Sequence, residues 1–142
     1  MAFWKFGKKE STDNNKKIST AIDIGSFLID FQLKTVGSTP GFDELFHSPF
    51  VRGYFVGVFS GAMQAFKIDG YGDDVKTMAF LVGGHVALIG EKHGFTYAMD
   101  SLKFQGHKDY DLGNRLGGQE IIAFFNKEIV VPRQLRDYII GN

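Results

Sequence analysis

Glycine recurs every four residues in one apolar segment of this chain, and that spacing limits how the segment can pack. The stretch VRGYFVGVFSGAMQAF places Gly53, Gly57, Gly61 and Ala65 four residues apart. Each glycine inside a helix costs roughly 1 kcal/mol relative to alanine, so three of them need a packing or functional reason. On a helix this spacing gathers the small residues on one flank and leaves the phenylalanines on the other. The pattern therefore predicts a helix with one bulky flank and one bare flank, which we call the glycine flank.

Two uses of the glycine flank are consistent with the sequence. It can let two helices of one bundle approach closely, which is the favoured interpretation, or it can dock a partner or a ligand. Glycine spacing alone does not separate the two. Shorter sets of small residues with the same four-residue spacing recur elsewhere in the chain, at Ala21/Gly25, Gly83/Ala87, Gly90/Gly94/Ala98 and Gly113/Gly117.

Helix start and stop signals divide most of the chain, and no strand pattern competes with them. Fifteen Phe and eighteen Gly stand beside three Pro in 142 residues, the size of one domain. We expect an all-α, compact single-domain bundle of five to seven helices with glycine-notched close packing. Residues 1–16 are expected to form a flexible basic tail and residues 17–142 the helical domain. The expected helices run from Ile18 to Gly37, from Pro49 (N-cap Ser48) to near Gly70, from Asp73 to Lys92–Gly94, over 95–106, over 112–129 and from Gln134 to Ile140.

Charge is unevenly distributed although the formal net charge is zero. Residues 1–17 carry five Lys against Glu10 and Asp13, a net of +3, which leaves −3 for the remaining 125 residues. A mildly acidic body lacks the basic face that nucleic acid requires, so no nucleic-acid partner is expected. The chain has no cysteine and no secretory signal pattern, and its apolar runs are too short to cross a bilayer. We expect a cytoplasmic protein without a transmembrane segment.

The N-terminal stretch MAFWKFGKK alternates aromatic and basic residues. Phe3, Trp4 and Phe6 could lie at a lipid surface while the lysines meet anionic headgroups. The same segment could instead fold back on the acidic body or remain disordered. Weak membrane-surface contact by the tail is therefore one of three alternatives.

Two patterns suggest metal ligands, and neither is complete. Glu44 and His47 share one helix face, but a di-iron bundle needs a second Glu-x-x-His motif, which the chain lacks. Asp109, Asp111 and Glu120 occupy positions 1, 3 and 12 of a calcium-binding EF-hand loop. That resemblance fails at its centre, where Gly113 and Asn114 stand at positions 5 and 6. We expect no metal and expect Asp109 or Asp111 to cap a helix, while cation binding by the three carboxylates stays open.

The histidines raise the question of haem, because the length and helical character of the chain resemble those of a globin. His93 would be the axial ligand and Gln64 the distal hydrogen-bonding group. His93 however precedes a glycine at an expected helix end, where a cation is favourable without a ligand, and His85 is expected to be a core histidine bonded to a carbonyl. We therefore expect no cofactor.

No nucleophile stands on a glycine elbow, and no set of titratable residues converges, so catalytic residues are not assigned and an enzyme is the third choice. The first function hypothesis is a small helical module that acts through protein contact, as a homo-oligomer or an adaptor. The alternative is a small-molecule binder with a Phe-lined pocket between helices.

Overall fold

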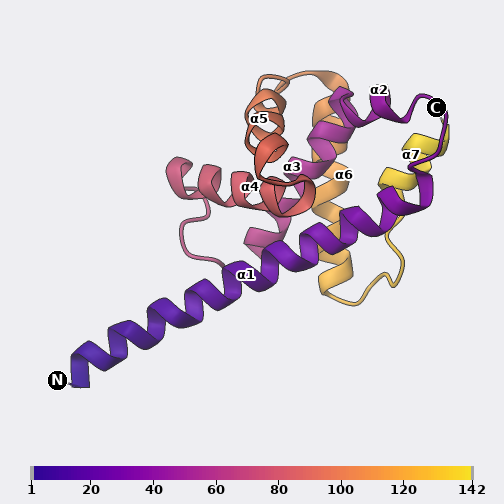
Figure 1. Ribbon diagram of the computed structural model, residues 1–142. Coiled ribbons are helices and arrows are strands. Elements are labelled where there is room, and N and C mark those ends of the chain that lie inside the picture. The colour runs from indigo at the N-terminus through magenta and orange to yellow at the C-terminus, as the bar shows by residue number, and fades with distance from the viewer. Residues whose placement is uncertain (1, 142) are drawn as a thin grey trace.

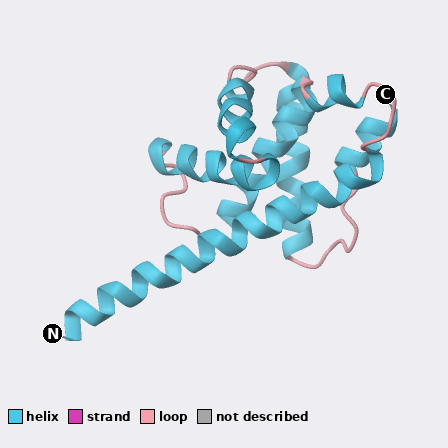
Figure 2. Cartoon of the chain, in the orientation of Figure 1, coloured by secondary structure: helices cyan, strands magenta, loops and turns pink. Residues whose placement is uncertain are grey.

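A computed structural model describes the backbone of residues 2–141 and the side chains of residues 14–141. The chain is 77% helical, and its described part contains seven helices and no strand (Figures 1 and 2). The expected all-α bundle is confirmed. The helices are α1 (Ala2–Val36), α2 (Phe42–Phe46), α3 (Pro49–Ala65), α4 (Asp74–Ile89), α5 (Glu91–Leu102), α6 (Lys108–Phe125) and α7 (Gln134–Gly141).

Helix α1 begins at Ala2, well before the expected start at Ile18, and so includes most of the segment 1–16 that the sequence assigns to a tail. The division into tail and domain stays a prediction. The side chains of residues 1–13, on which membrane contact by Phe3, Trp4 and Phe6 depends, lie outside the described residues.

Backbone contact between α3 and α6 forms the centre of the molecule, where the two helices lie side by side (Figure 1). A Cβ atom added to Gly53 or Gly57 would come closer than 3.0 Å to the carbonyl oxygen of Tyr110 or Asn114, respectively. A Cβ on Gly61 would lie 2.6 Å from Ile121 Cγ2 and 3.1 Å from the Gly118 backbone. The first two contacts and the Gly118 contact share one sequence offset, so α3 and α6 run parallel.

Helix α6 contributes its own glycines to the same interface. A Cβ on Gly113 would approach the Phe50 carbonyl oxygen, and a Cβ on Gly117 would approach that of Tyr54, both closer than 3.0 Å. Three glycines of the glycine flank therefore pack inside the molecule. Ala65, the fourth residue of the flank, is half-buried at the last position of α3.

Glycines elsewhere make room for one aromatic ring. The fully buried Phe59 of α3 lies 3.1 Å from the position of a Cβ on Gly25 of α1 and 2.5 Å from that of a Cβ on Gly84 of α4. The ring thus fills sockets on two neighbouring helices. The bulky flank of α3 packs α1 and α4 around the core, as the sequence pattern predicts.

The expected helix between Asp73 and Lys92–Gly94 is wrong at its C-terminal end. Asp73 accepts a hydrogen bond from the Lys76 amide at 3.0 Å and caps α4, but α4 ends at Ile89 and Gly90 has a φ of 91°. Gly94 is buried inside α5, where a Cβ would lie 2.6 Å from Val86 Cα. Gly90 and Gly94 could each end a helix. Gly94 lies inside α5 instead, because the close contact with the α4 backbone leaves no room for a side chain there.

Other helix bounds also differ from expectation: the helices expected over 95–106 and 112–129 are α5 (Glu91–Leu102) and α6 (Lys108–Phe125), each four residues earlier. Helix α3 ends at Ala65 rather than near Gly70, because Lys67 adopts a left-handed φ of 52°. Ser48 stands at the N-cap of α3 as expected, but its hydroxyl donates to the Leu45 carbonyl at 2.6 Å and does not cap the helix.

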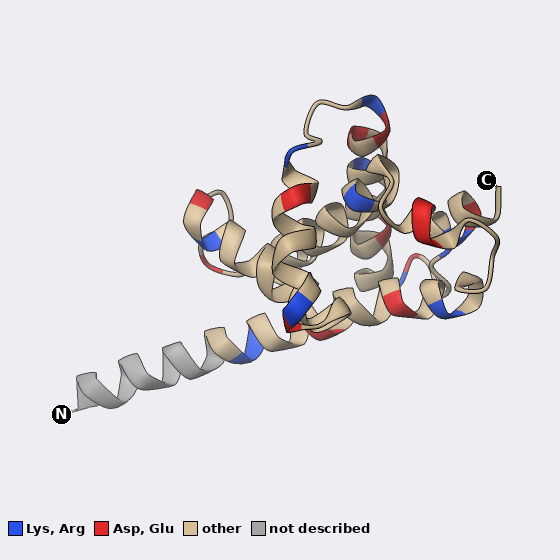
Figure 3. Ribbon diagram, turned by 45° about the horizontal axis from the view of Figure 1, so that its top comes forward, with Lys and Arg blue, Asp and Glu red and all other residues tan. Residues whose placement is uncertain are grey.

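Charged residues of both signs are spread over the described helices (Figure 3). Ion pairs between described residues are exposed and local, such as Lys34 with Asp30 at 2.9 Å. Pairs of this kind contribute little to stability. Within the described part, no helix has both the length and the apolar character needed to cross a bilayer.

Replacing Gly57 with alanine is expected to lower the free energy of unfolding by about 1–3 kcal/mol, because the new Cβ overlaps the Asn114 backbone. Gly83→Ala is the matched control. Gly83 also lies inside a helix, but its Cβ would meet only Ile22 Cδ1 at 3.4 Å, so its higher helix propensity should raise stability by up to about 1 kcal/mol. Urea denaturation followed by circular dichroism measures both changes. Unchanged stability of Gly57→Ala would contradict the backbone contact.

Candidate functional site

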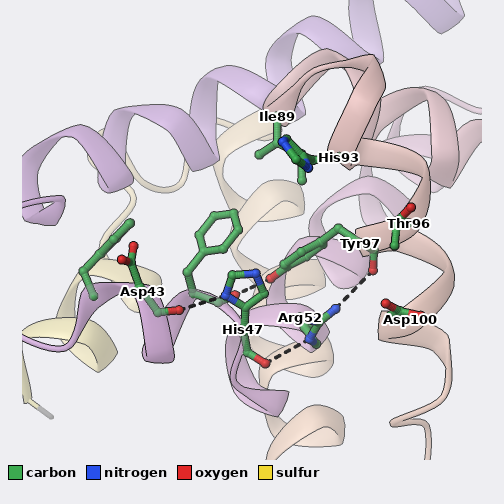
Figure 4. A pocket seen from close by; sticks show the side chains of 10 residues that line it. Asp43, His47, Arg52, Ile89, His93, Thr96, Tyr97 and Asp100 are labelled. Atoms are coloured by element: carbon green, nitrogen blue, oxygen red, sulfur yellow. Dashed lines mark hydrogen bonds between the residues drawn. The ribbon is translucent and has the colours of Figure 1, made fainter.

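A cavity of about 490 Å³ lies where α2, α3 and α5 meet near the end of α4. Its apolar wall is mainly aromatic, and polar side chains stand at its edges (Figure 4). Four of its residues, His93, Thr96, Tyr97 and Asp100, follow helical spacing along one face of α5. The lining residues are Phe42, Asp43, Phe46, His47, Arg52, Ile89, His93, Thr96, Tyr97 and Asp100. We refer to it as the Arg52 cavity.

Arg52 enters the cavity from α3, directly before the glycine flank, and only 8% of its surface is exposed. Its Nε donates to the His47 carbonyl at 2.9 Å (Figure 4). Its Nη1 donates to the Tyr97 carbonyl at 3.2 Å and to Ser101 Oγ at 3.0 Å. The guanidinium carbon lies 4.3 Å from the centre of the Tyr97 ring and 5.6 Å from that of Phe104. Carbonyl groups and ring faces therefore surround the cation.

Among the described residues, Arg52 forms no ion pair, and its Nη2 donates to none of them. Nη2 is also not one of the described side-chain atoms that are buried without a hydrogen-bond partner, so it retains contact with solvent. Arg52 lines the cavity, and Nη2 is its one nitrogen without a partner among the described residues. Asp100 lines the same cavity but binds Lys103 Nζ at 3.1 Å.

Two histidines stand at the rim of the cavity, and both are exposed. His47 follows the last residue of α2, and its Nδ1 bonds to the Asp43 carbonyl at 2.8 Å. A carbonyl oxygen can only accept, so Nδ1 carries the proton and Nε2 of the neutral ring is left as an acceptor. The His47 ring lies 5.2 Å from that of Phe46 and 5.9 Å from that of Tyr97.

His85 lies in the core behind this wall, with no exposed surface. Its Nδ1 donates to the Leu81 carbonyl at 2.7 Å, and its Nε2 is buried without a hydrogen-bond partner. The rings of Phe59 and Tyr97 lie 5.3 Å and 5.8 Å away. Burial lowers the pKa of His85 to about 4, with a smaller contribution from the charge of Arg52. His85 is therefore neutral at pH 7, as expected for a core histidine.

The structure separates the residues that the sequence grouped into metal and haem sites. Glu44 does not line the Arg52 cavity, and the described residues contain no group of three or more potential metal ligands of the His, Cys, Asp or Glu type. His93 lines this cavity, whereas Gln64 lines a groove beside α6. The two residues therefore do not face a common haem pocket.

Residues 109–120 lie inside the continuous helix α6, almost from its start, and form no loop, so Asp109, Asp111 and Glu120 do not have the EF-hand geometry that their spacing resembles. His107 caps this helix by accepting from the Asp109 amide at 3.1 Å, while Asp111 accepts from the Gly106 amide at 3.2 Å. Neither aspartate is the N-cap residue. Glu120 is buried and accepts from the amides of Arg133 and Gln134 at the start of α7.

Sequence reasoning missed Arg52 as a site residue. A signal was present, because Arg52 lies in an apolar helix and the positions three and four residues away are Ser48, Pro49, Phe55 and Val56, none of them acidic. An arginine without a carboxylate on its own helix face needs a partner from elsewhere. Comparison of the chain with protein-family models, curated proteins and solved structures finds no match.

Acid is expected to destabilise the protein through His85. Between pH 6.5 and about 4 the unfolded chain binds a proton that folded His85 does not, so the free energy of unfolding falls as the pH is lowered. A pKa change of about 2.5 corresponds to a loss on the order of 3 kcal/mol by pH 4. Urea denaturation between pH 7 and pH 4 measures it.

His85→Leu should lose this part of the pH dependence, while the exposed control His93→Leu should keep it. The comparison with the control removes contributions from carboxylates, which titrate in the same range. Identical pH profiles for the unchanged protein and His85→Leu would contradict a neutral, buried His85.

Proposed function

We propose that this protein binds a small organic molecule in the Arg52 cavity. The observation that carries the proposal is a cavity of about 490 Å³ that combines an aromatic wall with Arg52, whose Nη2 has no partner among the described residues. Ligand pockets are concave, roughly 300–1,000 Å³ in volume and mostly apolar, with a few polar groups that orient the ligand. Phe42, Phe46 and Tyr97 provide the wall, and Arg52 and Thr96 provide the polar groups.

Hydrogen bonds between elements hold the cavity open in a defined shape. The Tyr97 hydroxyl donates to the Phe46 carbonyl at 2.5 Å, which ties α5 to α2. Arg52 ties α3 to both, through the carbonyls of His47 and Tyr97. A preformed wall reduces the ordering that a ligand must cause on binding, which favours affinity.

Titration with small aromatic and aliphatic compounds, followed by amide NMR, tests this proposal. Compounds that bind should shift the resonances of Thr96, Tyr97 and His47 together. Thr96→Trp places an indole at the exposed edge of the cavity and should reduce the affinity at least tenfold, because a ring of that size occupies the space of the ligand. Lys92→Trp is the control, one helical turn earlier on α5 and outside the cavity lining. Shifts that spare the cavity, or binding unaffected by Thr96→Trp, would contradict the proposal.

Self-association is a second candidate function, favoured by one surface of α1. Phe27 and Phe31 are 59% and 42% exposed, and their ring centres are 6.1 Å apart. Adjacent exposed rings favour contact with another apolar surface. The glycine flank supplies little such surface, because α6 covers Gly53, Gly57 and Gly61, so we place the contact of a homo-oligomer on α1.

Light scattering coupled to size-exclusion chromatography tests self-association across a concentration series. The unchanged protein should exceed its monomer mass of 15.8 kDa as concentration rises. The double variant Phe27→Gln/Phe31→Gln should remain monomeric. The same replacement at Phe95, an exposed phenylalanine on α5, is the control and should associate like the unchanged protein. A monomer at every concentration would remove this candidate.

A further inference from the structure

We propose that the ligand of the Arg52 cavity is a small monocarboxylate with an apolar body, and that its carboxylate accepts hydrogen bonds from Arg52 Nη2. This inference rests on the proposed function and names the class of molecule that the cavity takes. The argument starts from the donors of the guanidinium.

Three of the five N–H groups of Arg52 are used within the protein. Nε donates once, to His47, and Nη1 donates twice, to the Tyr97 carbonyl and Ser101 Oγ. The two N–H groups of Nη2 remain, and both belong to a group that keeps its positive charge at any ordinary pH. The ligand therefore meets a charged donor in an almost fully buried side chain.

Burial of a cation without an anion is costly, and the groups around Arg52 offset only part of that cost. Carbonyl oxygens and the rings of Tyr97 and Phe104 contribute partial negative charge. A full negative charge at Nη2 would form a charge-assisted hydrogen bond, which is stronger than one between neutral groups. An anionic ligand group thus gains more here than a neutral amide or hydroxyl of the same shape.

The carboxylates of the cavity favour a single negative charge on the ligand. Asp43 and Asp100 line the same cavity, and only Asp100 has a cationic partner, Lys103 at 3.1 Å. A phosphate monoester carries close to two negative charges at pH 7 and would be repelled by both aspartates. A carboxylate carries one negative charge, which balances the one positive charge of Arg52, and it can accept from the N–H groups of Nη2.

The apolar lining of the cavity determines what the rest of the ligand can be. Phe42, Phe46, Ile89 and Tyr97 present ring and aliphatic surface to the cavity. Burial of apolar surface against them contributes roughly 25 cal/mol per Å². A carboxylate joined to an aromatic ring or a short alkyl chain satisfies both the wall and Arg52.

Matched acids and amides test the inference on the full chain. Benzoate, phenylacetate and hexanoate are each compared with their primary amide, and phenyl phosphate is added, by amide NMR and calorimetry. We expect at least one acid to shift the cavity resonances and to bind roughly tenfold or more tightly than its amide. Phenyl phosphate should bind more weakly than the acids.

Each alternative result identifies what fails. Amides that bind in the cavity as tightly as their acids overturn the inference and leave the proposed function standing. Phenyl phosphate that binds more tightly than every acid overturns the choice of a monocarboxylate. Failure of all seven compounds to shift the cavity resonances overturns the proposed function together with the inference.

A second measurement places the anion at Arg52. In the unchanged protein, the side-chain nitrogen resonances of Arg52 should shift on addition of the acid and not on addition of its amide. Arg52→Gln should abolish the preference for acids, whereas Arg115→Gln, at an exposed arginine on α6, should keep it. Unshifted Arg52 resonances in the acid complex would overturn the inference even if Arg52→Gln does not fold.

Discussion

The close backbone contact of α3 with α6 determines where the other elements can lie. The contacts of Gly53 with Tyr110 and of Gly57 with Asn114 share one sequence offset, so the two helices run parallel and in one register. A parallel pair requires the chain to return to its starting end between the two helices, and α4 and α5 make that return. The return brings α5 beside the first turns of α3, where Tyr97 and Ser101 meet Arg52. The cavity is thus a consequence of the glycine contact.

A buried polar cluster extends this arrangement to α1 and α7. Gln32 donates to the Tyr54 hydroxyl at 2.8 Å and accepts from the amides of Leu135 and Arg136, while Tyr54 donates to Glu120. Burial, and then the charge of Glu120, raise the pKa of Tyr54 well above its ordinary value, so its hydroxyl remains a donor. The first amides of a helix lack partners within that helix, and Gln32 and Glu120 supply them for α7. The short last helix is therefore held by side chains from α1 and α6.

The sequence predicted the starts of α3, α4 and α7 and the close packing of the glycine flank, and it missed which distant residues would meet. Pro49 and Asp73 mark helix starts through backbone geometry and capping, and both starts are found. Gly90 and Gly94 satisfy the same stop rule, and only contact with Val86 decides between them. Glu120 matched a calcium-loop pattern because spacing does not reveal a partner such as Tyr54, 66 residues away. The candidate site was missed for the same reason, since the neighbours of Arg52 come from Tyr97 and Ser101, at separations of 45 and 49 residues.

Arg52 is also the residue whose presence stability alone explains least. Buried charged groups can often be replaced by apolar side chains of similar volume without loss of stability, and Arg52 lies among rings that would accept such a side chain. One of its partners needs no guanidinium, because the Tyr97 carbonyl also accepts from Ser101 Oγ at 2.6 Å. Among the described residues, no carboxylate forms an ion pair with it. A buried cation without an ion pair among the described residues, at the wall of a cavity that its own hydrogen bonds help to shape, is an arrangement that favours the proposed ligand contact.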